Sequence, residues 1–321
     1  MLQELKNKVL AGEGITKDEA MYLVNLDESR TMELLAAANE IKNKFIGKKV
    51  DLCSIVNAKS GSCSEDCTFC SQSAHYNTGT VTYPLMAKED ILARAKEMEG
   101  SGAEHFGIVT SGRGVVSDED FENLIEAFRL IREETNLEVC ASLGTLDEKR
   151  AEKLANVGLK RYNHNLETSE SYYAEICTTH TYQDRVNTVK FLKERGMEVC
   201  SGGIIGLGES FEDRVDLAFT IKELDVDSVP INILNPVKGT PLYGNDPVPP
   251  METLKTAAIF RFILPTKVIK LCGGRENNLR DLQSLSLLSG VNGLLIGNYL
   301  TTEGRATAED LQMIKDLGLG E

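Results

Sequence analysis

Short runs of apolar and β-branched residues alternate along this chain with longer amphipathic segments. The short runs predict β-strands, and the segments in which apolar residues recur every three or four positions predict α-helices. The predicted strands are Val50–Asn57, His105–Ser111, Glu138–Gly144, Gly158–Asn165, Glu198–Gly206, Asp227–Leu234, Lys267–Gly273 and Gly293–Gly297. The predicted helices between them are Lys88–Glu99, Asp118–Glu134, Leu146–Asn156, Tyr182–Arg195, Phe211–Leu224 and Met251–Leu264.

Eight strands that alternate with helices predict an α/β protein with a parallel sheet. Eight is also the number of strands that closes a (β/α)8 barrel of the TIM type, which is the architecture we expect. The alternative is an open doubly wound sheet, but a cysteine-rich loop follows the first strand where a phosphate-binding glycine motif would be expected. Before that strand, Ile15–Val24 and Arg30–Phe45 have helical spacing. We therefore predict a helical segment over residues 1–49 and the barrel over residues 50–321.

Length and charge narrow the function. The 321 residues suit one such barrel or two ordinary domains. A formal net charge of −14 argues against a nucleic-acid partner, which needs a basic face. No stretch reaches the roughly 18 apolar residues of a membrane span, and the N-terminus lacks a signal peptide, so we expect a cytoplasmic protein without a membrane partner. In a reducing compartment, the eight cysteines are more often metal ligands or catalytic groups than disulfides.

Three cysteines lie close together after the first predicted strand, namely Cys63, Cys67 and Cys70 in a CxxxCxxC arrangement. Such a loop can bind three irons of a [4Fe–4S] cubane and leave the fourth iron open for chemistry. Zinc is the alternative, but a structural zinc site takes four ligands, and no second CxxC or HxxxH motif follows. The least favoured interpretation is that three unrelated buried cysteines have this spacing by coincidence.

This motif, with Phe69 before its last cysteine, resembles the signature of the radical S-adenosylmethionine superfamily. Further segments resemble the biotin synthase family within it, from about Val50 to the C-terminus. These segments are Ser71–Tyr76, Tyr162–Glu167, Cys200–Glu209, Val229–Asn232 and Lys238–Pro241. The resemblance implies that the open iron binds S-adenosylmethionine, and that reductive cleavage gives methionine and a 5′-deoxyadenosyl radical.

The same resemblance implies a reaction and partners. Two successive hydrogen abstractions from dethiobiotin would allow sulfur from an auxiliary iron–sulfur cluster to be inserted, which forms biotin. The protein's part would be to hold the reacting groups in place and to exclude water. The resemblance further implies a homodimer and an electron donor of the flavodoxin or ferredoxin type.

Four of the remaining cysteines, Cys53, Cys140, Cys200 and Cys272, fall in the first, third, fifth and seventh predicted strands. Alternate strands of a barrel contribute side chains to the same interior layer, so these four thiols can converge on one point. The alternative is that each cysteine is simply a small buried hydrophobe. The eighth cysteine, Cys177, lies in a helix-like stretch, and we assign it to packing.

The family comparison supports an auxiliary cluster at this point but with different ligands. Biotin synthases usually hold a [2Fe–2S] cluster in the barrel with three cysteines and an arginine. Cys140 and Cys200 match two of those cysteines, whereas Gly107 stands in place of the third and Lys270 in place of the arginine. Two of the four usual ligands are therefore missing.

We expect a second cluster that is present but altered. The set Cys140, Cys200 and Cys272 suits a cubane with one open iron, which could carry an extra sulfide for donation. If Cys53 also binds, the cubane is fully ligated, and the donated sulfur must come from its core or displace a ligand. We favour the three-ligand form slightly.

Polar residues at the predicted barrel mouth suit a substrate. Asn163 and Asn165 end the fourth strand, where active sites of this fold lie, and their amides can donate and accept hydrogen bonds to a ureido ring. By resemblance, Asn163, Asn165 and Asn232 contact dethiobiotin. The contacts to S-adenosylmethionine that the resemblance implies are Glu167 with the ribose hydroxyls, Arg185 with the methionine or carboxylate end, Phe69 near the adenine, and the Ile204 backbone with the adenine. His164 points the opposite way by alternation, and we expect a structural role for it.

Two other functions stay open. A different radical enzyme of related barrel type, such as a hydrogenase-maturation or methylornithine-forming enzyme, would share the first cluster. We do not expect it to combine the motif Tyr162–Asn165 with interior cysteines on three strands. An iron–sulfur electron carrier or scaffold without a substrate would need neither a barrel of this size nor the asparagines at its mouth.

Overall fold

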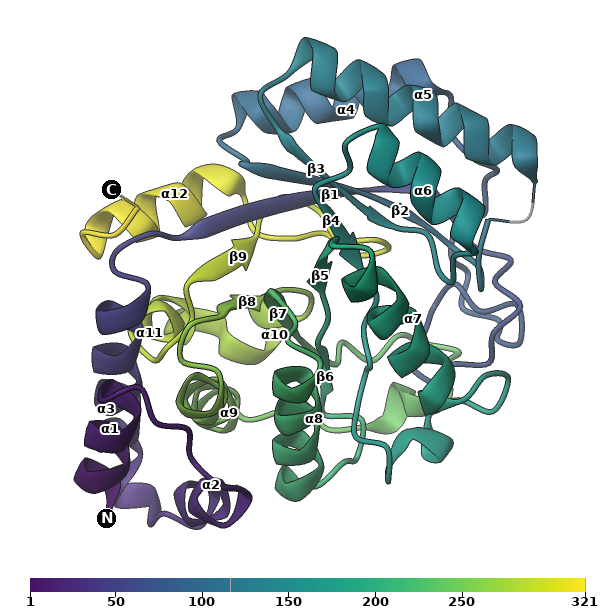
Figure 1. Ribbon diagram of the computed structural model, residues 1–321. Helices are drawn as coiled ribbons and strands as arrows, with labels where there is room; N and C mark the ends of the chain where they lie inside the picture. The colour runs from purple at the N-terminus through teal and green to yellow at the C-terminus, as the bar shows by residue number, and fades with distance from the viewer. Residues whose placement is uncertain (116, 321) are drawn as a thin grey trace.

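The computed structural model describes residues 1–115 and 117–320. Parallel strands form a closed barrel surrounded by helices (Figure 1). The strands are β1 (Asp51–Lys59), β2 (His105–Thr110), β3 (Glu138–Ser142), β4 (Arg161–Asn163), β5 (Glu198–Cys200), β6 (Gly203–Ile205), β7 (Ser228–Ile233), β8 (Val268–Leu271) and β9 (Gly293–Leu295). Their order is β5-β4-β3-β2-β1-β9-β8-β7-β6, and a further pairing of Cys200 with Ser228 closes the ring between β5 and β7. The predicted (β/α)8 architecture is confirmed, and the open doubly wound sheet is wrong.

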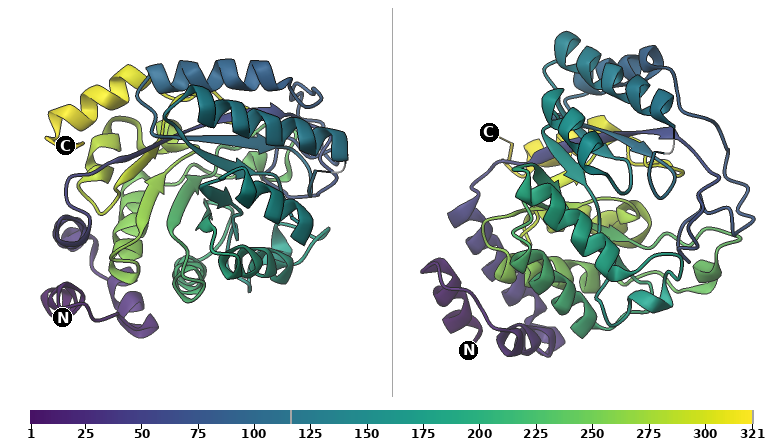
Figure 2. Two further views of the ribbon diagram at one scale, coloured as in Figure 1. Left: turned by 45° about the horizontal axis from the view of Figure 1, so that its top comes forward. Right: turned by 45° about the vertical axis from the view of Figure 1, so that its right-hand side comes forward.

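The helices predicted between the strands are all present and surround the barrel (Figure 2). They are α4 (Lys88–Gly100), α5 (Asp118–Glu134), α6 (Glu148–Asn156), α7 (Tyr182–Glu194), α8 (Phe211–Glu223) and α9 (Pro250–Ile263), and the chain continues through α10 (Arg275–Leu279), α11 (Gln283–Leu287) and α12 (Thr307–Asp316). Side-chain caps fix several starts: Ser117, Asp147, Thr181 and Ser210 each accept a hydrogen bond from the backbone at the third helical residue. These residues explain why α5, α7 and α8 begin where the pattern predicts, and why α6 begins at Glu148 and not at the predicted Leu146.

The fifth predicted strand, Glu198–Gly206, differs from the expectation because it is divided into β5 and β6. At Gly202 the backbone passes so close to β7 that an added Cβ would lie 1.9 Å from the carbonyl oxygen of Pro230. At Gly203 an added Cβ would lie 2.3 Å from the carbonyl oxygen of Glu167. Only glycine allows these approaches, so the strand bends here and its two halves together fill one position in the barrel.

The N-terminal helices α1 (Leu2–Leu10), α2 (Lys17–Val24) and α3 (Thr31–Phe45) lie outside the barrel. A capping box between Thr16 and Glu19 starts α2. Helix α2 packs on α8 and α9, and α3 packs on α9. The buried Lys42 Nζ donates a 2.7 Å hydrogen bond to the carbonyl oxygen of Leu287. The segment therefore covers one side of the helical layer and does not enter the barrel interior.

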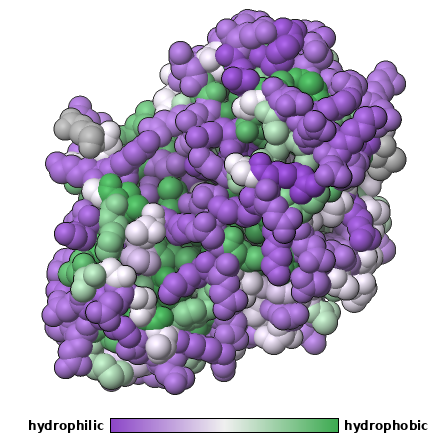
Figure 3. All heavy atoms as spheres, in the orientation of Figure 1, coloured by the Kyte–Doolittle hydropathy of each residue, from purple (hydrophilic) through white to green (hydrophobic). Residues whose placement is uncertain are grey.

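The C-terminal helix is tied to the barrel by a buried ion pair. Arg275, at the start of α10, binds Asp310 of α12 with Nη1 to Oδ1 at 3.0 Å and also through its second guanidinium nitrogen. Most of the surface in Figure 3 is hydrophilic, with smaller apolar areas between polar side chains. None of the helices among the described residues is long and apolar enough to cross a membrane.

Candidate active site

A cavity of about 470 Å³ runs from the barrel interior to the loops that follow the carboxyl ends of the strands. This is the end of the fold where such barrels carry their active sites. Every site residue predicted from the sequence lines this one cavity. They are Cys53, Cys63, Cys67, Phe69, Cys70, Cys140, Asn163, Asn165, Glu167, Arg185, Cys200, Ile204, Asn232 and Cys272.

The CxxxCxxC loop after β1 is held in shape by its own backbone. Cys63 N donates to the carbonyl oxygen of Gln72 at 3.0 Å, and Cys70 N donates to that of Cys67 at 3.0 Å. The buried Gln72 side chain accepts hydrogen bonds from Gly61 N and Asn57 Nδ2, both at 3.2 Å. These hydrogen bonds within the protein hold the loop so that all three cysteines line the cavity. Their three sulfur atoms therefore fit a cluster with one open iron.

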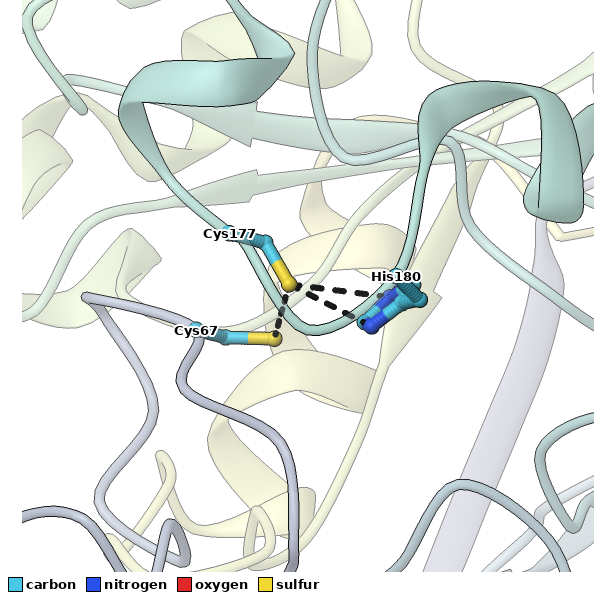
Figure 4. A group of neighbouring side chains, drawn as sticks. All are labelled: Cys67, Cys177 and His180. Atoms are coloured by element: carbon cyan, nitrogen blue, oxygen red, sulfur yellow. Dashed lines mark hydrogen bonds between the residues drawn. The ribbon is translucent and has the colours of Figure 1, made fainter.

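A fourth cysteine stands beside this loop (Figure 4). Cys177 Sγ lies 3.8 Å from Cys67 Sγ and 3.2 Å from His180 Nδ1. His180 Nδ1 in turn lies 2.5 Å from Glu65 Oε2. Both Cys177 and Cys67 are buried, and the three ligand atoms of Cys67, Cys177 and His180 lie within 4.8 Å of one another. The sequence analysis predicted only a packing role for Cys177, so this contact with Cys67 and His180 was missed.

Glu167 and Arg185 form a polar pair on the cavity wall. Glu167 has a backbone φ of 72°, and its Oε1 lies 3.5 Å from Arg185 Nη1. Arg185 also donates to Tyr173 Oη at 2.6 Å and to the carbonyl oxygen of Asn165 at 2.9 Å. Burial raises the pKa of Glu167, and the charge of Arg185 opposes this shift.

The second carboxylate oxygen of Glu167 is available to accept a hydrogen bond from a ligand. Glu167 Oε2 is buried and has no hydrogen-bond partner among the described residues. A buried acceptor without a partner costs free energy, and a ribose hydroxyl could satisfy it. Phe69 and Ile204 line the same cavity, and Ile204 N donates to the carbonyl oxygen of Glu167 at 2.8 Å. The residues present therefore fit S-adenosylmethionine.

The three asparagines predicted for the substrate are fixed by hydrogen bonds from neighbouring groups. Asn232 Oδ1 accepts from Gly273 N at 3.0 Å, and Asn165 Oδ1 accepts from Gly202 N at 3.3 Å. Asn163 Nδ2 lies 3.4 Å from Asn165 Oδ1. Asn163 is also the register partner of Cys200, which places an amide beside an interior cysteine.

Interior cysteines lie on β1, β3 and β5 and directly after β8, as the spacing predicts. Gly107 also lines the cavity, and a Cβ added to it would lie 3.9 Å from Cys140 Cβ. Gly107 thus borders the cysteine set without offering a ligand. On every strand that leads to one of these cysteines, an ionisable residue stands two positions earlier and so on the same strand face. The pairs are Asp51 and Cys53, Glu138 and Cys140, Glu198 and Cys200, and Lys270 and Cys272.

These ionisable residues form a charged network on the amino-terminal side of the cysteines along the strands. Asp51 lies 2.5 Å from Lys270 Nζ, 3.1 Å from His105 Nε2 and 3.8 Å from Arg161 Nη1. Burial alone would raise the pKa of Asp51, but the hydrogen bond from His105 and the charge of Lys270 outweigh it and lower the pKa. The network was not predicted from the sequence. The two-residue spacing was a signal for the four residues that precede the cysteines, but not for His105 and Arg161, which reach Asp51 from other strands.

The interior donor set fits an iron–sulfur cluster. Burial raises the pKa of the Cys140 and Cys272 thiols, and the charge of Lys270 opposes the shift in both. Cysteine binds metal as a thiolate, so buried cations next to these sulfurs favour the form that a cluster needs. The alternative interpretation, that these cysteines are only small buried hydrophobes, does not explain why buried cations lie beside them.

Two family models match the chain, that of the radical SAM superfamily over residues 59–221 and that of the Biotin and Thiamin Synthesis associated domain over residues 230–320. The chain is 56% identical over 319 residues to the biotin synthase of Pelotomaculum thermopropionicum, with 99% of each chain covered. It belongs to the biotin synthase family. It is likewise 54% identical over 313 residues to the biotin synthase of Clostridium acetobutylicum, with 97% of this chain and 95% of that protein covered.

Membership confirms the resemblance seen in the sequence and makes the protein a radical S-adenosylmethionine enzyme. Its cofactors include a [4Fe–4S] cluster and S-adenosylmethionine. Among solved structures, methylornithine synthase is similar with a TM-score of 0.85 at 22% identity, covering 98% of this chain and 96% of that one. The hydrogenase maturase HydG of Carboxydothermus hydrogenoformans gives 0.83 at 20% identity, covering 99% and 78%. These two likenesses establish a shared barrel only, so the alternative functions gain no support from them.

Proposed function

We propose that this protein forms biotin from dethiobiotin with sulfur from an auxiliary iron–sulfur cluster held by Cys140, Cys200 and Cys272. One observation carries the proposal: a single cavity is lined by both cysteine sets and by the asparagines. The register pairing of Asn163 with Cys200 supports the proposal, because it would bring a substrate-binding amide next to the sulfur source. A substrate held by that amide would lie within reach of both sets of cysteines.

At the first cluster site, Cys63, Cys67 and Cys70 are the proposed ligands. When bound, the cluster and S-adenosylmethionine supply the radical that removes hydrogen from carbon. The chain's own part is to orient the reactants and keep water away. Glu167 would accept hydrogen bonds from the ribose hydroxyls through its unpartnered Oε2, while Arg185 forms an ion pair with the other carboxylate oxygen and would bind the methionine end.

The remaining contacts follow from the cavity lining. Phe69 and Ile204 would border the adenine, and Asn163, Asn165 and Asn232 would bind the ureido ring of dethiobiotin. Amides suit a ureido group because each can donate to its carbonyl oxygen and accept from its N–H groups. Since backbone N–H groups already hold two of the amides, little side-chain entropy is lost on binding.

For the auxiliary site we propose a cubane with three cysteine ligands and an extra sulfide on the fourth iron. The absence of a side chain at Gly107 and the presence of Cys272 two residues after Lys270 support this ligand set. Cys53 lines the same cavity, and in this form of the proposal it stays a free thiol.

Three further features belong to the proposal. The electron donor would be of the flavodoxin or ferredoxin type, and the active protein would be a homodimer. Residues 1–49 would be a helical extension of the barrel, since α2 and α3 pack on the outer helices α8 and α9.

Anaerobically reconstituted protein with dethiobiotin, S-adenosylmethionine and a strong reductant tests the function, with biotin and 5′-deoxyadenosine followed by mass spectrometry. We expect both products. The Cys67→Ala variant should form neither, because it lacks a ligand of the first cluster. The Cys140→Ala variant should form 5′-deoxyadenosine without biotin, because only the sulfur source is damaged. Deoxyadenosine without biotin in the unmodified protein would contradict the proposal and indicate a different radical reaction.

A further inference from the structure

Arg161 has one half of its guanidinium group satisfied and the other half free. Its Nε and Nη2 both donate to Glu198 Oε2, at 3.2 and 3.1 Å. Its Nη1 is buried and has no hydrogen-bond partner within residues 1–115 and 117–320. The nearest carboxylate oxygen with which it forms an ion pair, Asp51 Oδ2, is 3.8 Å away, which is too far for a hydrogen bond.

The free Nη1 belongs to the barrel interior. Arg161 is only 8% exposed and lines the cavity. Its register partner on β3 is Cys140, and Cys200 pairs with Asn163, two residues further along β4. Strand β4, which carries Arg161, therefore lies between β3 with Cys140 and β5 with Cys200.

The buried charges around Arg161 sum to a positive value, which favours binding of an anion. Lys270 and Arg161 are buried cations of the interior network, and Asp51 is the buried carboxylate between them. Glu198 and Glu138 are partly exposed, with 34% and 50% of their side-chain surface accessible. Solvent therefore screens the outer carboxylates, while the inner end of the network keeps a surplus of positive charge towards the cysteines.

We infer that Arg161 is a positioning residue for sulfur transfer, and that its Nη1 donates hydrogen bonds to sulfur atoms on the Cys140–Cys200 side of the auxiliary cluster. The inference rests on the proposed function. Hydrogen bonds to cluster sulfurs and nearby charge set the reduction potential of a cluster. Arg161 would stabilise the reduced, more anionic form, while Glu198 fixes the orientation of the guanidinium.

The test uses full-length, anaerobically reconstituted protein and the variants Arg161→Met and Arg161→Lys. Lys160→Met is the matched control, because Lys160 is the neighbouring residue and also binds Glu198, at 2.9 Å, but is 46% exposed. For each protein we would measure iron and acid-labile sulfide, the midpoint potentials of both clusters by electron paramagnetic resonance titration, and the yields of 5′-deoxyadenosine and biotin.

In Arg161→Met we expect the auxiliary potential to become more negative and the potential of the first cluster to stay unchanged. Biotin per auxiliary cluster should fall about tenfold, as expected for one lost hydrogen bond to a charged group, while deoxyadenosine is maintained. Arg161→Lys keeps the charge and should give an intermediate potential, so it also serves if the methionine variant does not fold. Lys160→Met should match the unmodified protein.

Two results would overturn the inference, and they are distinguishable. If the auxiliary potential and spectrum of Arg161→Met or Arg161→Lys equal those of the unmodified protein, Arg161 does not act on the cluster, and the proposed function still stands. If the unmodified protein holds iron and sulfide for one cluster only, the auxiliary site itself is refuted, and the inference about Arg161 falls with it.

Discussion

The sulfur of Cys177 lies 3.8 Å from the sulfur of Cys67, although 110 residues separate them in sequence. The backbone brings them together, since Thr68 N donates to the carbonyl oxygen of Ile176 at 2.9 Å. Asp66 strengthens the contact by accepting from Thr178 N at 2.9 Å. In the cluster-free chain the Cys67 thiol donates to Cys177 Sγ. When Cys67 binds iron as a thiolate it can only accept, so a protonated Cys177 would then donate the S–H···S hydrogen bond.

Replacement of Cys177 tests this hydrogen bond. Cys177→Ala should keep the iron of the first cluster, because three ligands remain, but should make its midpoint potential more negative through loss of a donor to sulfur. Cys177→Ser is the control, since a hydroxyl keeps a donor at the same place and should restore most of the potential. Loss of cluster iron in Cys177→Ala would instead indicate that Cys177 is a ligand.

The auxiliary ligand set is tested by two single substitutions. Cys272→Ala should lose iron and sulfide from the auxiliary cluster, whereas Cys53→Ala should retain them, because only the first of these cysteines is a ligand in the three-cysteine form. Iron and acid-labile sulfide per chain are the measurements. Full auxiliary iron in Cys272→Ala would refute the proposed set, and loss of iron in Cys53→Ala would indicate a fully ligated cubane.

Glu167→Gln should weaken binding of S-adenosylmethionine. The substitution removes the charge that faces Arg185 at 3.5 Å and weakens the acceptor at the unpartnered Oε2. A hydrogen bond that involves a charged group is worth about 1.5–3 kcal/mol, so the KM for S-adenosylmethionine should rise by about tenfold or more. The exposed Glu170→Gln variant is the control and should leave KM unchanged. An unchanged KM in Glu167→Gln would exclude the ribose contact.

The stability of the folded chain should depend on pH through His164. Burial, with the charge of Arg185 adding to it, lowers the pKa of His164 to about 3. Its pKa in the unfolded chain is about 6.5, so the unfolded state binds the extra proton between these values. Stability is therefore complete above about pH 6.5 and falls by up to about 1.4 kcal/mol per pH unit as the pH drops towards 3.

Urea unfolding of the cluster-free chain at several pH values measures this dependence. His164→Gln should have a shallower pH dependence than the unmodified chain in the same window, whatever its absolute stability. His75→Gln is the matched control, because it removes a histidine that is exposed in the folded chain. Equal slopes for His164→Gln and the unmodified chain would show that His164 is protonated in the folded state.

Much of the fold follows from local sequence pattern. Alternation between short apolar runs and amphipathic segments is a property of neighbouring residues, so the strands, the helices and their order could be predicted. The CxxxCxxC loop was equally readable, because its ligands lie within eight residues. The interior cysteines could also be predicted, since side chains on alternate strands of a barrel share one interior layer. The division of the fifth predicted strand at Gly202 was not predicted, because it depends on the short distance to Pro230 on a neighbouring strand.

The sequence by itself therefore determined the barrel, the first cluster loop and the interior cysteines that line the cavity. Only the tertiary structure decided which side chains from distant segments meet. The contact between Cys177 and Cys67 and the network of Asp51, Lys270 and Arg161 depend on register and on the closure of the ring. Local periodicity predicts which face of a strand or helix a side chain occupies, but it does not predict which side chain on another strand will contact it. That neighbour is fixed by packing of the whole chain, because buried charges are stable only where partners from other elements reach them.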